Sequence, residues 1–419
     1  MTAARATRGI REECARGAAR GWDGSRILRP RVLVVVSTYL PGVKGGGHIR
    51  SISALATHLG DELDPFVICG DRDSGDESAY PNIRVGEWTL VGNAQVMYLS
   101  RSGFSTKLYQ TVLAELRPDV LYLNTVFSVR EIIVPAMVAR RRYPSVRIIV
   151  APRGCLNPGA LALKRKKKLV FLRALRWSRL PKSLIWQASS ETEALSIRDA
   201  IGKVDTVVAS NLPMVTGSVM VQASPKNRPS KASGKLEIIF LSRISPMKNL
   251  EYLLKRLANV RGEIDLTIAG PVEDVSYWAQ CEKLFARRLS HVSVRQIGSV
   301  AHDDVASVLA SHHIFVLPTR GENFGHVILE AFDAGLGVVV SDRTPWRGLE
   351  QLGAGWDLPL ENPLAWEHVL QTCCDMDGRA LETMSAAAKS ATAALFDVDA
   401  AKHANLALFY PAGTSPNAL

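Results

Sequence analysis

Two glutamates eight residues apart mark the stretch of the sequence with the clearest capacity for chemistry. Glu322 lies in a polar loop after the apolar run 314–317, and Glu330 lies in a helical pattern that begins near Phe324. The start of a helix carries unpaired N–H groups that favour anionic or hydroxyl-rich ligands. Because eight residues make about two helical turns, the two carboxylates and His326 can face one ligand. The alternative is a helix-capping glutamate and a solvated surface glutamate.

A pair of cations forms a second candidate site. Arg243 and Lys248 follow the apolar run 236–241 and precede a helical pattern from Asn249. Parallel sheets hold phosphate groups at this kind of strand-to-helix loop. The planar fork of Arg and the compact charge of Lys can together neutralise a diphosphate leaving group. Two solvated surface cations are the alternative.

Three consecutive glycines follow the first predicted strand. Gly45, Gly46 and Gly47 could let backbone N–H groups approach a phosphate or a sugar closely. They do not form a full GxGxxG motif, so a tight turn would explain them equally well. His48 enters the following helix and could contact a ligand or serve only the fold.

Asp71 and Asp73 spell the DxD motif that some sugar-transferring enzymes use to bind a divalent cation. They lie in a loop rich in Asp, Gly and Ser, where acidic residues commonly serve turn formation. Because Arg243 and Lys248 can supply the positive charge that a metal would supply, we expect no metal. The six cysteines are scattered without a CxxC pair, which favours a reducing compartment and gives no zinc-site pattern.

Apolar runs and helical patterns alternate along the chain on both sides of residues 217–235, which are typical of a linker. We predict strands at 32–37, 65–69, 120–123, 147–151, 183–188 and 206–209, and then at 236–241, 266–269, 292–296, 314–317 and 337–341. We predict helices at 48–59, 249–260, 275–289, 303–311 and 324–334. This alternation is typical of an α/β protein with two Rossmann-like, doubly wound parallel-sheet domains, here 32–216 and 236–397. Ligands of such sheets bind at the carboxyl ends of the strands, so we expect a central cleft that both domains face.

The composition describes a globular protein of 419 residues, 47% hydrophobic and 22% charged. Its net charge of +11 is concentrated in two segments: residues 1–31 carry +5 and residues 161–183 carry +9, so the remainder carries −3. This concentration argues against a general nucleic-acid-binding surface. Residues 1–31 lack the apolar region of a secretory signal, and we expect a disordered basic extension there. No apolar run approaches the roughly 20 residues of a membrane span.

The second basic segment interleaves cations with apolar residues. A helix here would suit an anionic bilayer surface, with the cations on the headgroups and the aromatic residues partly inserted. The predicted membrane contacts are Lys164, Arg165, Lys166, Lys167, Lys168, Phe171 and Trp177. A solvated basic face whose leucines pack on the core remains an alternative, as does an RNA-binding patch with two stacking aromatic residues.

The stretch Glu322-Asn-Phe-Gly…Glu330-Ala…Gly335 resembles the E-x7-E signature of retaining glycosyltransferases of family 4, whose architecture is GT-B. Residues 341–346 and 355–359 resemble that family's C-terminal domain. Residues 241–250 resemble its donor-phosphate element, residues 37–48 its N-terminal glycine loop, and Arg153-Gly154 its acceptor-side loop. The resemblance covers residues 32–411. The sequence departs from the commoner pattern at Asn323, where glycine is frequent, and at Gly337, where proline is frequent.

The resemblance implies transfer of a sugar from a nucleotide-sugar donor to a saccharide or lipid-linked saccharide, with retention and without a metal or other cofactor. The C-terminal domain would bind the donor and the N-terminal domain the acceptor, and a C-terminal helix at 398–410 would pack back on the N-terminal domain. Arg243, Lys248 and Glu322 are the implied catalytic residues. The implied donor contacts are Gly46, Gly47, Asn323, Phe324, Gly325 and Glu330, and the acceptor-side contacts are His48, Arg153 and Gly154.

We therefore expect a hexosyltransferase-like enzyme of cell-surface polysaccharide synthesis. We place it in the cytoplasm, peripheral on the inner face of the plasma membrane, without nucleic acid as a partner. Two alternatives stay open at this point. One is a nucleotide-sugar epimerase of GT-B architecture, which would need no acceptor. The other is a non-catalytic nucleic-acid-binding protein, which salt-dependent gel shifts would reveal.

Overall fold

The computed structural model describes residues 29–162, 164–214, 228–288 and 291–410, which divide into two compact units. The N-terminal unit runs to residue 214 and takes in the chain from Val398 onward, and the C-terminal unit lies between. Almost all of the predicted basic extension, and residues 215–227 at the boundary between the units, lie outside the described residues. Each described unit is built on a parallel sheet covered by helices, so the predicted fold class of two parallel-sheet α/β domains is confirmed.

The N-terminal unit holds an eight-stranded sheet in the order β3-β4-β2-β1-β5-β6-β7-β8, in which only β3 is antiparallel to its neighbour. Its strands are β1 (Arg31–Val35), β2 (Asp64–Gly70), β3 (Trp88–Val91), β4 (Ala94–Leu99), β5 (Val120–Asn124), β6 (Arg147–Ala151), β7 (Ile185–Ala188) and β8 (Asp205–Val208). Its helices are α2 (Gly47–Leu59), α3 (Thr106–Leu116), α4 (Val134–Arg142), α5 (Pro158–Ala162), α6 (Arg165–Trp177), α7 (Glu191–Ile201) and α14 (Val398–Phe409). A π-helical turn, η1 (Val129–Ile133), leads into α4, and a 3-10 turn, η2 (Leu180–Ser183), leads into β7.

The central strand β1 explains why the apolar runs predicted the sheet. It pairs in parallel with β2 on one side and with β5 on the other, and Val32 to Val35 are fully buried. Strands buried on both faces read as continuous apolar runs. The strand begins one residue before the prediction, at Arg31, because Arg31 pairs with Asp64 of β2; the Arg31 N–H also donates to the Asp119 carboxylate at 2.8 Å.

Two strands at one edge of this sheet were not predicted. β3 and β4 form a hairpin whose two-residue turn is Gly92-Asn93, with Gly92 at φ 58°. A Gly-Asn pair between two β-prone runs is a hairpin signal. Of these two strands, β3 lies at the edge of the sheet, and its exposed residues interrupt the apolar run that marks the central strands.

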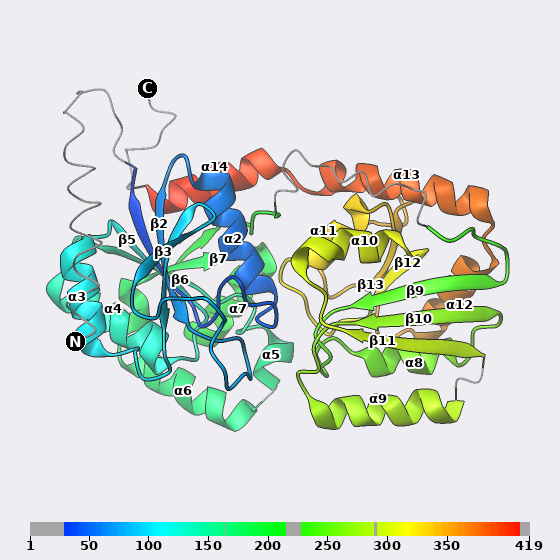
Figure 1. Ribbon diagram of the computed structural model, residues 1–419, viewed down its shortest axis with the longest axis horizontal. Coiled ribbons are helices and arrows are strands. Elements are labelled where there is room, and N and C mark those ends of the chain that lie inside the picture. Colours follow the sequence, from blue (N-terminus) through cyan, green and yellow to red (C-terminus); the bar gives the residue numbers. More distant parts are fainter. Residues whose placement is uncertain (1–28, 163, 215–227, 289–290, 411–419) are drawn as a thin grey trace. The chain divides into compact units, whose positions relative to one another are not determined.

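The C-terminal unit holds a six-stranded parallel sheet in the order β11-β10-β9-β12-β13-β14. Its strands are β9 (Lys235–Leu241), β10 (Glu263–Ala269), β11 (Val292–Gly298), β12 (Ile314–Leu317), β13 (Gly337–Ser341) and β14 (Gly355–Leu358). Its helices are α8 (Leu250–Leu257), α9 (Val275–Arg288), the 3-10 turn η4 (His302–Asp304), α10 (Val305–Ala310), α11 (His326–Asp333), α12 (Pro363–Asp375) and α13 (Gly378–Leu395). Figure 1 shows α8 and α9 on one face of the sheet and α10 and α11 on the other, as in a doubly wound domain.

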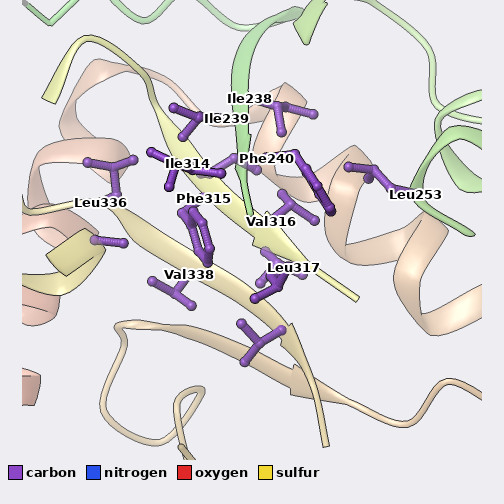
Figure 2. Close-up of a cluster of buried hydrophobic side chains, with 14 of the residues drawn as sticks. Ile238, Ile239, Phe240, Leu253, Ile314, Phe315, Val316, Leu317, Leu336 and Val338 are labelled. Atoms are coloured by element: carbon purple, nitrogen blue, oxygen red, sulfur yellow. The ribbon is translucent and has the colours of Figure 1, made fainter. Parts of the chain in front are cut away.

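The core of the C-terminal unit lies around β9, β12 and β13. Phe240 and Phe315 project from adjacent strands and are fully buried among aliphatic side chains such as Val316 and Leu336 (Figure 2). Burial of each such side chain contributes about 1.5–3 kcal/mol. This packing fixes the strands whose carboxyl ends carry the candidate residues.

Helix α14 packs within the N-terminal unit. The Phe409 ring meets the Tyr122 ring edge-on at 5.2 Å, and Asn405 Nδ2 donates to the carbonyl of Ser210 at 2.8 Å. The Tyr410 hydroxyl donates to the carbonyl of Glu62 at 2.9 Å. The last described residues therefore complete the hydrogen bonding of strands that lie about 200 residues earlier in the chain.

Among the helices of the described residues, none combines the length and the apolarity needed to cross a bilayer.

A buried histidine links the start of β12 to β9. His313 is 1% exposed; its Nδ1 accepts the N–H of Glu237 at 3.0 Å, and its Nε2 donates to the carbonyl of Pro229 at 3.1 Å. Because Nδ1 must stay unprotonated to accept this bond, the neutral ring fits the fold. Burial lowers the pKa of His313 to about 4. The unfolded chain binds a proton near pH 6.5, so this contribution to stability is complete above pH 6.5 and is lost as the pH falls toward 4.

We predict that the free energy of unfolding falls more steeply on acidification in the wild type than in His313→Asn. Asn keeps an acceptor near the Nδ1 position but cannot titrate. The His313 contribution between about pH 7.5 and pH 5 amounts to about 2 kcal/mol. Urea unfolding over this pH range measures it, with the exposed His368→Asn on α12 as a control that keeps the wild-type slope. Parallel profiles for wild type and His313→Asn would contradict the assignment.

Candidate functional site

The carboxyl ends of β9 and β12 bring two of the predicted residues into contact. Lys248 lies in the loop after β9 and Glu322 in the loop after β12, 74 residues later. The Lys248 Nζ donates to Glu322 Oε2 in an ion pair whose side chains are only 11% and 17% exposed. β9 and β12 are neighbours in the sheet, so their following loops emerge side by side.

Backbone contacts lock these two loops together. The carbonyl of Met247 accepts the N–H of Arg320 at 2.8 Å and the Thr319 hydroxyl at 3.2 Å. Asn249, in the left-handed region at φ 62°, donates its side-chain amide to the carbonyl of Pro318 at 3.0 Å. Lys248 and Glu322 are therefore held by flanking residues whose positions are fixed independently of the ion pair.

The loop after β13, the other neighbour of β12 in the sheet, also fixes Glu322. The Glu322 N–H donates to the carbonyl of Arg343, just after β13, at 2.9 Å. The Ser341 hydroxyl donates to the carbonyl of Thr319 at 2.5 Å. The loops after β9, β12 and β13 thus form one hydrogen-bonded edge, and Glu322 lies at its centre.

Arg243 lies in the same loop as Lys248 but has a different partner. Its Nη1 donates to Glu273 Oε1 at 2.9 Å, with side chains 38% and 48% exposed. An exposed ion pair of this kind contributes about 0–1 kcal/mol. Arg243 can therefore exchange Glu273 for a ligand anion at small cost, whereas Lys248 keeps a half-buried partner.

The predicted donor contacts Asn323, Phe324 and Gly325 form the turn that leads into α11. The Phe324 ring is buried beside Trp346 and Phe396, with ring centroids 5.8 and 5.2 Å away, and the Phe324 carbonyl accepts the Trp346 Nε1–H at 2.5 Å. The side chain of Phe324 is therefore part of the core, which leaves the backbone of Asn323 to Gly325 as the predicted contact. The sequence analysis did not identify Trp346 as the residue that fixes this turn.

Gly325 is the N-cap of α11 and explains why the helix begins at His326 rather than near Phe324. Its φ of 79° lies in the left-handed region, and a side chain there would clash with Ile328 and Glu322. Glu330 follows one turn after His326 and is half-buried on the same helix face.

In the N-terminal unit, a glycine loop (residues 38–47) joins β1 to α2. Gly46 caps α2 at φ 73°, and a side chain at Gly45 would clash with the Thr38 hydroxyl. His48 Nε2 lies 2.8 Å from that hydroxyl, so this predicted acceptor-side residue also supports the loop. The predicted Gly47 begins the helix and is exposed.

The predicted DxD residues are buried and have protein partners. Asp71 pairs with Arg72, with Nε and Oδ1 2.7 Å apart. Asp73 accepts backbone N–H groups from Val43, Lys44 and Ser74. Across the described part of the chain, no three His, Cys, Asp or Glu side chains gather in a way that could hold a metal ion.

Arg153 and Gly154 lie at the carboxyl end of β6, both at positive φ. The Arg153 guanidinium donates to Asn124 Oδ1 at 3.0 Å, to the Tyr122 hydroxyl at 2.6 Å and to the Asn211 side chain. The Gly154 N–H donates to the buried Glu193 carboxylate at 2.6 Å. Asn124, Asn211 and Glu193 are not among the predicted residues. Asn124 is polar at the end of an apolar strand, and this signal in the sequence could have pointed to it.

The basic segment forms α6, whose cations divide into two groups. Lys168 donates to the carbonyl of Ala160 at 2.7 Å and lies over the Phe127 ring at 5.1 Å, and Phe171 packs edge-on against the same ring. The predicted contacts Lys164, Arg165, Lys166 and Lys167 are exposed, and Trp177 is 91% exposed. Lys168 and Phe171 thus contribute to packing, while the other predicted contacts face away from the core.

Part of the chain matches a described family model and several known proteins. Residues 222–356 match the family model described as "Glycosyl transferases group 1". The gpi3 subunit of phosphatidylinositol N-acetylglucosaminyltransferase from Schizosaccharomyces pombe is 32% identical over 115 residues, 26% of this chain and 25% of that protein. The sulfoquinovosyl transferase SQD2 of Arabidopsis thaliana is 33% identical over 104 residues, 25% of this chain and 19% of that protein. The chain thus spans a quarter or less of the length of these curated relatives.

A solved structure extends the likeness to both units. The crystal structure of Anabaena Alr3699/HepE in complex with UDP-glucose matches 90% of this chain and 99% of that chain, with a TM-score of 0.65 and 17% identity. At this identity the likeness concerns the fold. The chain therefore has the GT-B fold of glycosyltransferases, and its residues 222–356 match the glycosyl transferases group 1.

Proposed function

We propose that the protein is a retaining glycosyltransferase that moves a sugar from a nucleotide-sugar donor to a saccharide or lipid-linked saccharide. The observation that carries this proposal is the largely buried pair of Lys248 and Glu322 at the carboxyl ends of β9 and β12. It lies inside the segment that matches the glycosyl transferases group 1. The E-x7-E resemblance supports assignment to family 4, which is part of this proposal.

The two members of the pair would act on different parts of the donor. The Lys248 ammonium carries three N–H donors, and Glu322 accepts one of them, so others can bind the diphosphate. Arg243 would leave its exposed pair with Glu273 to bind the same group. Both cations would stabilise the charge that develops on the leaving diphosphate.

The carboxylates would bind the hydroxyl groups of the donor. Lys248 holds one oxygen of Glu322, so the carboxylate would present its other oxygen to the transferred sugar. Glu330, along the same helix face as His326, would bind the ribose hydroxyls. We propose departure and attack on one face of the sugar, with a phosphate oxygen helping to take the acceptor proton.

The relatives suggest which donors and acceptors to examine first. The HepE structure contains UDP-glucose, the gpi3 relative is named for N-acetylglucosamine transfer to phosphatidylinositol, and SQD2 for sulfoquinovose transfer. A thermal-shift screen of nucleotide sugars, followed by acceptor-dependent release of nucleotide diphosphate, tests the proposal. We place the product in cell-surface polysaccharide synthesis.

Replacement of Lys248 with Ala should slow sugar transfer by about 10²–10³-fold, because a donor to the leaving group is lost. Initial rates at saturating donor measure the effect, with circular dichroism to establish that the variant is folded. Lys255→Ala is the matched control, since Lys255 forms an exposed pair with Glu251 on α8. Wild-type turnover in a folded Lys248→Ala protein would remove Lys248 from the mechanism.

Sugar transfer should proceed at an unchanged rate in excess chelator, because Arg243 and Lys248 supply the positive charge and Asp73 already accepts three backbone N–H groups. The rate with EDTA, compared with the rate after addition of manganese or magnesium, checks this. If EDTA abolishes transfer and manganese restores it, Asp71 and Asp73 become candidate ligands.

We further propose that α6 docks the protein on an anionic membrane surface. Lys164 to Lys167 are exposed without an acidic residue among them, and Trp177 and Val170 are 91% and 67% exposed. Each basic residue near such a surface contributes about 1 kcal/mol, within a Debye length of about 10 Å. This supports a peripheral location on the inner face of the plasma membrane.

Lys166→Glu with Lys167→Glu should reduce binding to anionic liposomes by about tenfold or more and leave transfer to a soluble acceptor intact. Co-sedimentation at low and high salt measures binding. The control is Arg140→Glu with Arg141→Glu on α4, which makes the same charge change on another exposed basic surface. Equal binding to neutral and anionic vesicles would contradict the proposal, and Lys168 is left unchanged because it packs on Phe127.

A further inference from the structure

The glycine loop has little means of holding its own shape. Between the end of β1 and the start of α2 its backbone turns sharply, and Gly46 sits at φ 73° and ψ −138°. Glycine loses more conformational freedom on ordering than any other residue, so an ordered run of three glycines needs outside contacts. The structure supplies them from the loop that follows β2, residues 71–80.

Asp73 provides the principal contact. Its Oδ2 accepts the N–H of Val43 at 2.6 Å and of Lys44 at 2.8 Å, while its Oδ1 accepts its neighbour's N–H, that of Ser74, at 2.8 Å. The side chain is buried. One carboxylate oxygen therefore holds two consecutive peptide groups of the glycine loop, immediately before Gly45.

Other contacts hold the loop against Asp73. The Tyr98 hydroxyl donates to the carbonyl of Leu40 at 2.6 Å. Gly42 fits against the Tyr80 hydroxyl, where a Cβ would lie 2.3 Å from that oxygen. The Tyr80 N–H donates to the carbonyl of Asp71 at 2.7 Å, which fixes Tyr80 to the same strand end as Asp73.

We infer that Asp73 is a positioning residue that pre-organises the glycine loop for the nucleotide-sugar donor. This inference rests on the proposed function and on the donor contacts predicted at Gly46 and Gly47. A loop already held in its binding shape loses less conformational entropy when the donor binds, so the affinity is higher. Asp73 thereby accounts for the second acid of the DxD sequence without a cation.

A carboxylate suits this position better than an amide. An ionised carboxylate only accepts hydrogen bonds, and here each of its oxygens faces backbone N–H groups. The side-chain amide of Asn has one oxygen and one NH₂ group. Its NH₂ group would face either the Val43 and Lys44 N–H groups or the Ser74 N–H group, and the hydrogen bonds on that side would be lost. Asp73→Asn therefore loosens the loop with almost no change in side-chain volume.

The first measurement is amide hydrogen exchange of the glycine loop, which needs no substrate. In folded Asp73→Asn protein, the Val43 and Lys44 amides should exchange about tenfold faster or more. The matched control is Asp76→Asn, which removes the same charge from the same loop. The Asp76 carboxylate pairs with the half-exposed side chain of Lys44 and not with a backbone N–H of the glycine loop in the described structure. Unchanged exchange in Asp73→Asn would overturn the inference.

The second measurement is the kinetics of transfer. Asp73→Asn should raise KM for the donor about tenfold while kcat stays within about twofold of wild type. A loss of folded protein alone would lower kcat and leave both KM values unchanged. A lower kcat with unchanged KM values, or an unchanged donor KM alone, would overturn the inference.

A second variant disturbs the loop while Asp73 stays in place, which covers the case in which Asp73→Asn fails to fold. Gly42→Ala should raise the donor KM, because its Cβ would lie 2.3 Å from the Tyr80 hydroxyl and 2.9 Å from the carbonyl of Tyr39. Addition of Tyr80→Phe removes the first of these clashes and should partly restore the donor KM. Within the described residues the Tyr80 hydroxyl has no hydrogen-bond partner, so its removal costs little elsewhere. A wild-type donor KM in folded Gly42→Ala protein would count against the inference. If wild-type protein transfers sugar from no nucleotide sugar, the proposed function fails, and hydrogen exchange alone decides the role of Asp73.

Discussion

The candidate site of the C-terminal unit depends on one constraint: two opposite charges taken largely out of water must stay in contact. A half-buried lysine without its partner carries a desolvation cost that a solvated lysine does not. The parallel sheet meets this constraint by placing β9 next to β12, which brings Lys248 to Glu322 across 74 residues of chain. The carbonyls of Met247 and Arg343 accept hydrogen bonds from the loop after β12, and these bonds hold Lys248 and Glu322 in contact.

The exposure of the two cations gives them different capacities. Lys248 is held by a shielded pair, so its ammonium is in place before any ligand arrives. Arg243 has an exposed and easily exchanged partner in Glu273. In the N-terminal unit Arg153 resembles Lys248 in this respect, because three side-chain oxygens already orient its guanidinium. Lys248 and Arg153 are thus held in place by protein partners, whereas Arg243 can exchange its partner, although all three follow the carboxyl ends of parallel strands.

Sequence patterns predicted the buried strands well and the edges poorly. β12 and β13 have the bounds that their apolar runs predicted. Strands buried on both faces consist almost entirely of apolar residues, so the ends of the run mark the ends of the strand. β3 is half-exposed, so its residues carry no such run. Likewise the E-x7-E spacing predicted Glu322 and Glu330 as site residues, but it could not reveal that Phe324 packs inward on Trp346 or that Glu273 binds Arg243. Those contacts depend on which loops the sheet order brings together, and local spacing does not encode that order.

The membership of α14 in the N-terminal unit has a consequence for the order of synthesis. Its Asn405 bonds to Ser210 and Gln187, but the whole C-terminal unit is translated between these partners. At about 5–20 residues per second, the ribosome needs on the order of 10–40 s to cover that interval. During this time Gln187 and the carbonyl of Ser210 lack their hydrogen-bond partner Asn405. By the end of the interval all strands of the C-terminal unit have been synthesised. The second unit along the chain can therefore complete its fold before the first.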